Sequence, residues 1–258
     1  MTQRTSVVRK VLLSVSSIIS AIAIIVAISV TSQRADSVED SAHKEIRIST
    51  QQASSGIHEF FRERSRIVTS LLGNPFVNGW FAGYSDRGSE IDSDPDYQRV
   101  VKLFKNESAN DPMIKSVFYA PKATYEYFDI NGRYNDDNYF TSKRPWWGEA
   151  LERDRLFITK PEIDANDKSI VTSIKSTVYG EDSQLLGVLG IDILASEIKN
   201  RLIDTMKYQG KGYGFLYTND GQMISFPDSQ NRIDMGTLPK LNVVDQKYRT
   251  DMVEVTWR

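Results

Sequence analysis

The side chains best suited to chemistry are concentrated in residues 139–147, which read Tyr-Phe-Thr-Ser-Lys-Arg-Pro-Trp-Trp. The guanidinium of Arg144 is a rigid fork of donors that matches a carboxylate. Trp146 and Trp147 offer apolar walls, an indole N–H donor and ring faces over which a cation can sit. These groups together predict a desolvated pocket that recognises a small molecule.

Three acidic residues follow this stretch, namely Glu162, Asp164 and Asp192. Their carboxylates are suited to hold an ammonium group, so the whole set favours a small zwitterion such as an α-amino acid. The same residues allow a second interpretation, in which the tryptophans fill the core at a helix start and Arg144 pairs with Asp164 or Glu162. In that interpretation Asp192 only caps a helical segment at 195–206.

Composition excludes several other kinds of site. The chain has no cysteine, which removes disulfides, thiolate metal sites and cysteine nucleophiles. Its two histidines, His43 and His58, lie in a stretch that predicts one long helix, so a histidine-centred triad or zinc site is not expected. The net charge of -2 gives no basic field for nucleic acid. With no catalytic or nucleotide-binding motif present, we expect no catalytic residues, no metal and no cofactor.

Residues 11–30 predict a transmembrane helix. They run for about twenty residues without a charge, which at 1.5 Å per residue spans roughly the 30 Å of a bilayer core. Basic residues precede the run and acidic residues follow it, so residues 1–10 are expected in the cytoplasm and everything after residue 30 outside. A cleaved signal peptide is the alternative, but this run is longer than a signal peptide's apolar region and no Ala-x-Ala site follows.

The exported part predicts an α+β fold. Residues 35–73 lack proline and carry an apolar stripe, which predicts a long stalk helix ended by Asn74-Pro75; it is either a lever to the membrane or a core helix. Residues 74–195 predict an α+β module, an antiparallel sheet with helices on one side. Its expected elements are a loop at 84–95, helices at 97–106 and 145–153, and strands at 114–120, 125–130, 170–178 and 185–193, with a turn at Asn131-Gly132.

Residues 196–258 predict a second, similar but incomplete module, because a strand–turn–strand pattern recurs in them. Its expected strands lie at 212–218, 223–226 and 251–257. No second apolar span follows, so we expect the chain to be a fragment or a truncated form of a longer receptor.

This order of elements and motifs resembles the double Cache sensor family of bacterial receptors, over roughly residues 10–258. The resemblance implies that residues 74–195 and 196–258 are tandem PAS-like modules, the second incomplete. Tyr139, Arg144 and Trp146 match the spacing with which the amino-acid-binding members hold a ligand carboxylate, and Trp147 stands where an aromatic residue is expected. Asp164 and Asp192 match the acids that take the ligand amine. Glu162 departs from the pattern, because a tyrosine commonly stands there, and its added charge favours amines over amino acids.

The resemblance implies the periplasmic sensing region of a chemoreceptor in the bacterial inner membrane. It implies an amino acid or amine ligand and a parallel homodimer formed through the long helix. The same sensor is also found on membrane histidine kinases and diguanylate cyclases, which remain the alternative. Two rivals of other classes are an anchored periplasmic hydrolase, against which the missing motifs argue, and an interaction module whose pocket is filled by its own side chains.

Overall fold

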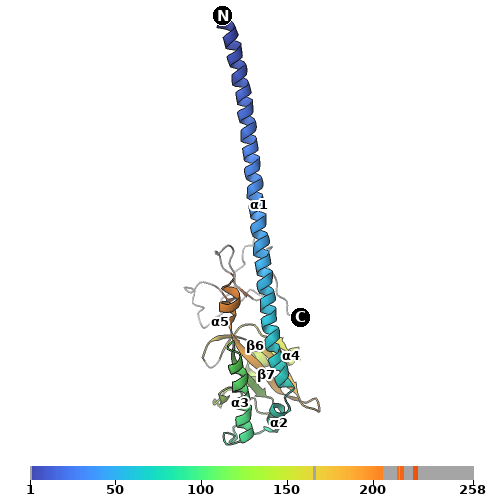
Figure 1. The fold of residues 1–258 in the computed structure, drawn as a ribbon. Helices are drawn as coiled ribbons and strands as arrows, with labels where there is room; N and C mark the ends of the chain where they lie inside the picture. The colour runs from blue at the N-terminus through green and yellow to red at the C-terminus, as the bar shows by residue number, and fades with distance from the viewer. Residues whose placement is uncertain (1, 165–166, 206–213, 215, 218–222, 226–258) are drawn as a thin grey trace.

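The computed structural model describes residues 2–164, 167–205, 214, 216–217 and 223–225. The chain begins with one continuous helix, α1 (Thr2–Leu72), whose far end stands well away from the sheet domain (Figure 1). The predicted anchor at 11–30 and the predicted stalk at 35–73 are therefore parts of the same helix. Between residues 18 and 30 its large apolar side chains are exposed, and by length and composition this helix is apolar enough to cross a membrane.

The last part of α1 packs against the sheet domain. Ile57, Phe61, Val68 and Leu71 are buried there, so this part of the helix belongs to the core. The helix ends at Leu72 as Asn74-Pro75 predicts, because the Asn74 carboxamide accepts hydrogen bonds from two backbone N–H groups of the next helix. That helix, α2 (Pro75–Gly83), was not expected from the sequence.

The other elements form an antiparallel sheet with short helices. The helices are α3 (Pro95–Asn110), α4 (Pro145–Arg153) and α5 (Ala195–Ile198), with a 3-10 turn at Thr141–Lys143 and a π-helix at Lys199–Ile203. The strands are β1 (Ile114–Pro121), β2 (Phe128–Asp129), β3 (Gly132–Arg133), β4 (Phe157–Ile158), β5 (Glu162–Ile163), β6 (Ile170–Tyr179) and β7 (Leu185–Leu194). The strand order is β3-β2-β1-β7-β6-β4, with β5 also paired to β6.

The structure corrects several predicted boundaries. The expected strand at 125–130 is reduced to Phe128–Asp129, and the hairpin turns at Ile130-Asn131, one residue earlier than predicted. Gly132 then pairs with Asp129 at a φ of 96°, a conformation that favours glycine. The predicted helix at 195–206 is α only to Ile198. The short strands β4 and β5 were not predicted.

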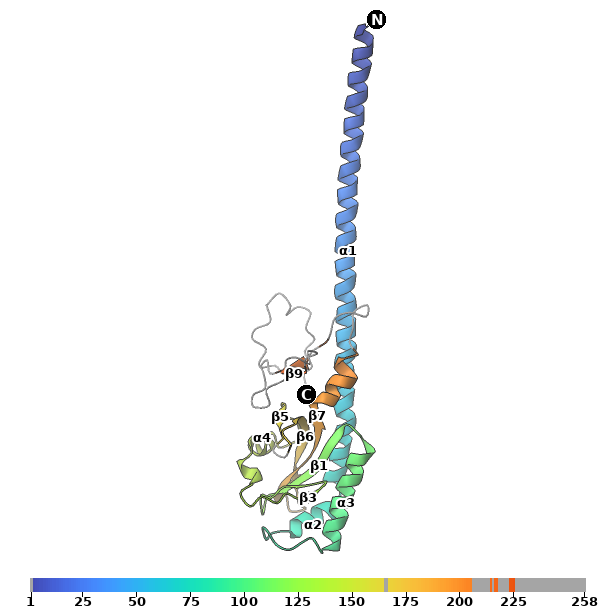
Figure 2. The same ribbon diagram turned by 90° about the vertical axis from the view of Figure 1, so that its left-hand side faces the viewer.

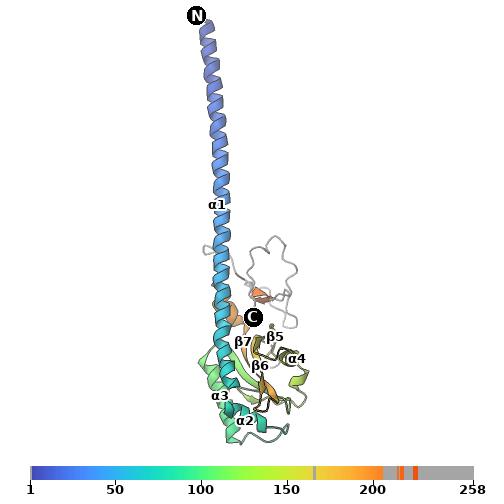
Figure 3. The ribbon, with the colours of Figure 1, turned by 90° about the vertical axis from the view of Figure 1, so that its right-hand side faces the viewer.

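Helices cover both faces of the sheet rather than one, which corrects the prediction. Figures 2 and 3 show α1, α2 and α3 against one face, and α4 with the segment leading into it on the other. Strand alternation explains the division, since successive side chains point to opposite faces. Leu189, Ile191 and Ile193 of β7 pack in the main core with α1 and α3, whereas Val188 packs in the smaller apolar cluster with α4. Asp192 shares this second face.

Only two short strands are described in the region predicted to form a second module. The antiparallel pair β8 (Leu216–Tyr217) and β9 (Met223–Ser225) agrees with two of the strands predicted for it. The predicted strand at 251–257 lies outside the described residues.

Candidate ligand-binding pocket

A pocket opens on the face of the sheet that carries α4. Its cavity volume is about 40 Å³, which is room for a few water molecules as the side chains stand. Six of the predicted site residues line it: Tyr139, Arg144, Trp146, Glu162, Asp164 and Asp192. The fold thus brings together side chains from α4, β5, β7 and the segment before α4.

Trp147 does not line the pocket. It is buried in the small apolar cluster under α4 with Ala120 and Ala150, and its ring meets the Tyr125 ring edge-on at 5.4 Å. Neighbouring residues of a helix point about 100° apart, so Trp146 and Trp147 cannot both face the pocket. The core-filling interpretation therefore describes Trp147, while Trp146 belongs to the same buried cluster and also lines the pocket.

Arg144 lies at the start of α4 and forms no ion pair with the residues that the structure describes. Its Nε is buried and makes no hydrogen bond, and its guanidinium carbon is 5.8 Å from the centre of the Tyr139 ring. The alternative interpretation pairs Arg144 with Glu162 or Asp164. In the structure both acids pair with lysines instead, Glu162 with Lys175 and Asp164 with Lys115. A buried donor atom that makes no hydrogen bond is costly unless a ligand or solvent completes it.

The segment that carries Tyr139 is held from outside the pocket by Arg87. Its guanidinium donates to three backbone carbonyl oxygens, those of Thr124, Asp137 and Tyr139, at 2.9 to 3.2 Å. It also lies 4.1 Å from the centre of the Phe140 ring. Because Arg87 bridges Tyr139 to the segment after β1, the pocket wall is fixed before any ligand arrives.

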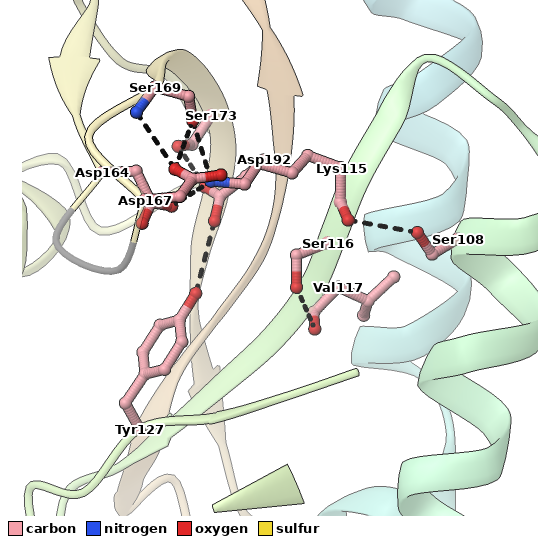
Figure 4. Close-up of polar contacts among 10 residues, drawn as sticks. All are labelled: Ser108, Lys115, Ser116, Val117, Tyr127, Asp164, Asp167, Ser169, Ser173 and Asp192. Carbon is pink, nitrogen blue, oxygen red and sulfur yellow. Dashed lines mark hydrogen bonds and ion pairs between the residues drawn. The ribbon is translucent and has the colours of Figure 1, made fainter. Parts of the chain in front are cut away.

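Asp192 lies near the C-terminal end of β7 and is 6% exposed. Its carboxylate accepts hydrogen bonds from Ser173 Oγ at 2.5 Å and from the Tyr127 hydroxyl at 3.3 Å (Figure 4). Burial raises the pKa of Asp192 to about 6, against the opposing effect of the Lys175 charge. Asp192 is no helix cap, since Leu194 stands at that position of α5 and no side chain caps it.

Two lysines hold the other acids of the pocket. Lys115 Nζ is 2.8 Å from Asp164 and 2.7 Å from Asp167, and it also donates to Ser169 (Figure 4). The register of β1 shifts at this lysine, and such a bulge turns a side chain away from its regular direction. Lys175 Nζ is 3.0 Å from Glu162.

No metal site accompanies these acids in the part of the chain that the structure describes, because no three metal-ligating side chains converge there.

Comparison with known proteins identifies the domain that contains this pocket. Residues 88–200 match the family model of the methyl-accepting chemotaxis protein-like first PDC sensor domain. This part of the chain is thus similar to PDC sensor domains. The methyl-accepting chemotaxis protein PscA of Pseudomonas syringae pv. tomato is 30% identical over 93 residues, which are 36% of this chain and 14% of PscA. The chain thus matches only a small part of the length of this relative.

Solved structures of similar fold are also sensor domains. The ligand-binding domain of the Pseudomonas aeruginosa amino acid chemoreceptor PctC, in complex with GABA, has a TM-score of 0.56 at 21% identity, over 73% of this chain and 77% of that domain. The ligand-binding domain of the Pseudomonas fluorescens chemoreceptor CtaA, in complex with L-serine, has a TM-score of 0.58 at 18% identity, over 74% and 75%. At these identities the likeness establishes the fold.

Sequence reasoning missed seven of the thirteen residues that line the pocket. They are Phe118, Tyr127, Tyr134, Ile163, Val171, Ser173 and Lys175. Strand alternation could have found some of them, because Val171, Ser173 and Lys175 stand two residues apart on β6 and share a face. The tyrosines come from irregular segments, where no period indicates a direction.

Gly190 of β7 makes room for two of these missed residues. A Cβ atom there would lie 2.8 Å from Phe118 Cζ and 3.0 Å from Lys175 Cγ, and 2.6 Å from the backbone oxygen of Ile174. We expect Gly190→Ala to lower the free energy of unfolding by about 1–3 kcal/mol, because the sheet and both side chains must shift. Thermal or denaturant unfolding of the full chain measures the change.

The matched control is Gly148→Ala in α4, where an added Cβ meets no atom within 4 Å. Alanine favours a helix, so this variant is expected to be as stable as the parent or slightly more stable. Equal stability of the two variants would show that Gly190 is not a packing constraint.

Proposed function

We propose that this chain is the membrane-anchored, extracytoplasmic sensing region of a bacterial chemoreceptor, and that its pocket binds a free amino acid. The observation that carries the proposal is the charge arrangement of the pocket. Among the residues that the structure describes, Arg144 and Asp192 form no ion pair, while Lys115 and Lys175 neutralise the remaining acids. An α-amino acid supplies the two missing charges, its carboxylate for Arg144 and its ammonium for Asp192.

The anchor gives the proposal its location. The apolar part of α1 is long enough for a bilayer, and the positive-inside rule puts residues 1–10 in the cytoplasm and the sensor domain outside. We propose that two chains pair through the long helix. A ligand then acts by preferring one of two arrangements of the sensor domain, and α1, whose last turns lie in the core of that domain, carries the difference toward the membrane.

The similar proteins support a chemotaxis output and a binding role without catalysis. The curated relatives are methyl-accepting chemotaxis proteins, rather than kinases or cyclases. The similar structures include one with GABA and one with L-serine bound, so small amino compounds are reasonable first ligands to test.

A thermal-shift screen of the full chain in detergent tests the proposal. The panel is the common L-amino acids, GABA and simple amines. A true ligand at about one hundred times its dissociation constant adds about 2.7 kcal/mol to the free energy of unfolding and gives a clear rise in melting temperature. Stabilisation by one or more amino acids supports the proposal. Stabilisation by amines alone, or by no compound of the panel, contradicts it.

A further inference from the structure

The Glu162–Lys175 ion pair is a part of the pocket that the proposed function does not use. The Lys175 side chain is only 3% exposed, its Nζ is 3.0 Å from a Glu162 oxygen, and Glu162 is 28% exposed. The same ammonium lies 4.6 Å from the centre of the Trp146 ring. A buried lysine is expensive to keep charged, and Glu162 with the Trp146 ring face stabilises that charge.

Strand register places this pair beside the site proposed for the ligand ammonium. Ser173 of β6 pairs with Asp192 of β7, and Lys175 pairs with Gly190, the next position on the same face. Lys175 therefore stands about 7 Å along the strand from the level of Asp192. Gly190, the strand partner of Lys175, has no side chain. The space next to Gly190 is therefore occupied by the side chains of Lys175 and Phe118.

A ligand anchored at Arg144 and Asp192 has to present its side chain to the remaining wall. Phe118 and Val171 provide apolar surface in the lining, and the Glu162–Lys175 pair provides charged groups that already satisfy each other. An aliphatic side chain pressed against it removes water without replacing any hydrogen bond, which is costly. A charged ligand side chain is repelled by one member of the pair, an anion by Glu162 and a cation by Lys175. A hydroxyl or carboxamide accepts from the lysine and donates to the glutamate at once.

We propose that the Glu162–Lys175 pair determines specificity, and that the pocket selects amino acids with a hydroxyl or carboxamide side chain over aliphatic ones of the same size. This inference rests on the proposed function, since it assumes that an amino acid occupies the pocket.

Threonine and valine are the sharpest pair of probes, because they differ by a hydroxyl in place of a methyl group. Calorimetric titration of the full chain in detergent is expected to show at least tenfold tighter binding of L-threonine than of L-valine. The double variant Glu162→Leu/Lys175→Met keeps the approximate volume of the wall and removes both charges together. In this variant the preference is expected to fall to less than threefold or to reverse, because the wall is then apolar.

The matched control is Glu149→Gln/Arg153→Gln, which removes an ion pair of the same 3.0 Å length from the outer side of α4. It is expected to keep the threonine preference of the parent. If the parent binds valine as tightly as threonine, the specificity proposal is overturned while the amino acid site stands. The specificity proposal also falls if the double variant folds and keeps the full preference. If the parent binds neither these two nor any other amino acid, the proposed function itself fails.

Discussion

Replacement of Arg144 by alanine is expected to weaken amino acid binding by about 100-fold or more, which corresponds to about 3 kcal/mol. The loss is large because the ligand carboxylate would then be buried beside Trp146 and Tyr139 without a counter-charge. The fold should survive the change, since Arg144 forms no ion pair with the described residues and its Nε makes no hydrogen bond. Titration calorimetry against the best ligand of the thermal-shift screen measures the affinity.

Two further variants sharpen this prediction. Arg144→Lys keeps the charge but loses the planar fork, so an affinity between those of the parent and the alanine variant is expected. Arg153→Ala removes an arginine of the same helix that pairs with Glu149 outside the pocket, and it should bind like the parent. Equal affinities for Arg144→Ala and Arg153→Ala would mean that the carboxylate is held elsewhere.

Replacement of Asp192 by asparagine is expected to change ligand affinity and stability in opposite directions. Affinity for an amino acid should fall by about 100-fold, because the ammonium loses its charged partner. Stability at pH 7 should rise, because the native fold holds this carboxylate in a buried site where ionisation is costly. A site residue that destabilises the empty protein is typical of functional positions.

The sign of the pH dependence follows from the pKa of Asp192, which burial raises from 3.8 to about 6. Between these values the folded protein binds more protons than the unfolded chain, so this group stabilises the fold fully below pH 4. Its contribution is lost as the pH rises through 6, by at most about 3 kcal/mol. The difference in unfolding free energy between the parent and Asp192→Asn, followed from pH 4 to 8, isolates the effect. A difference that does not change with pH would contradict it.

Ligand binding should show the reverse dependence on pH. An ammonium beside Asp192 favours the ionised carboxylate, so binding below about pH 6 releases a proton, and affinity falls by up to tenfold for each pH unit. The groups that face this carboxylate are Tyr127, Ser173 and the charges of Lys175, Asp164 and Glu162. In Asp192→Asn this dependence should be much weaker, which assigns it to the one residue.

The sequence was informative where a pattern has a period or a fixed partner. The long strands at 170–178 and 185–193 and the helix at 145–153 were predicted within about a residue, because alternation and the Arg-Pro-Trp-Trp start define them. The two-residue strands β4 and β5 have no period of their own, since their pairing with β6 alone makes them strands. The helix α2 follows too soon after the predicted end of α1 to be recognised.

The pocket was predictable in its type of chemistry rather than in its pairings. Residues as far apart as Arg144 and Asp192 could be grouped, because the Arg-x-Trp segment and the acids suit one kind of ligand, whereas Tyr139 was added by the family resemblance. The ion pairs between the basic residues and the acids of the pocket could not be predicted from the sequence, because they depend on strand register and on the bulge at Lys115. Lys175 was overlooked for the same reason, and Trp147 was assigned to the pocket because adjacent indoles look equivalent in a sequence.

The measurement that tests the central claim most directly is a calorimetric comparison of one amino acid with two of its analogues. The amino acid is the best ligand of the screen; its methyl ester lacks the carboxylate charge, and the matching α-hydroxy acid lacks the ammonium. We expect the free amino acid to bind at least 30-fold more tightly than either analogue. The variant Arg144→Ala should lose discrimination against the ester alone, and Asp192→Asn discrimination against the hydroxy acid alone. Equal binding of all three compounds to the parent chain would contradict the account of this pocket.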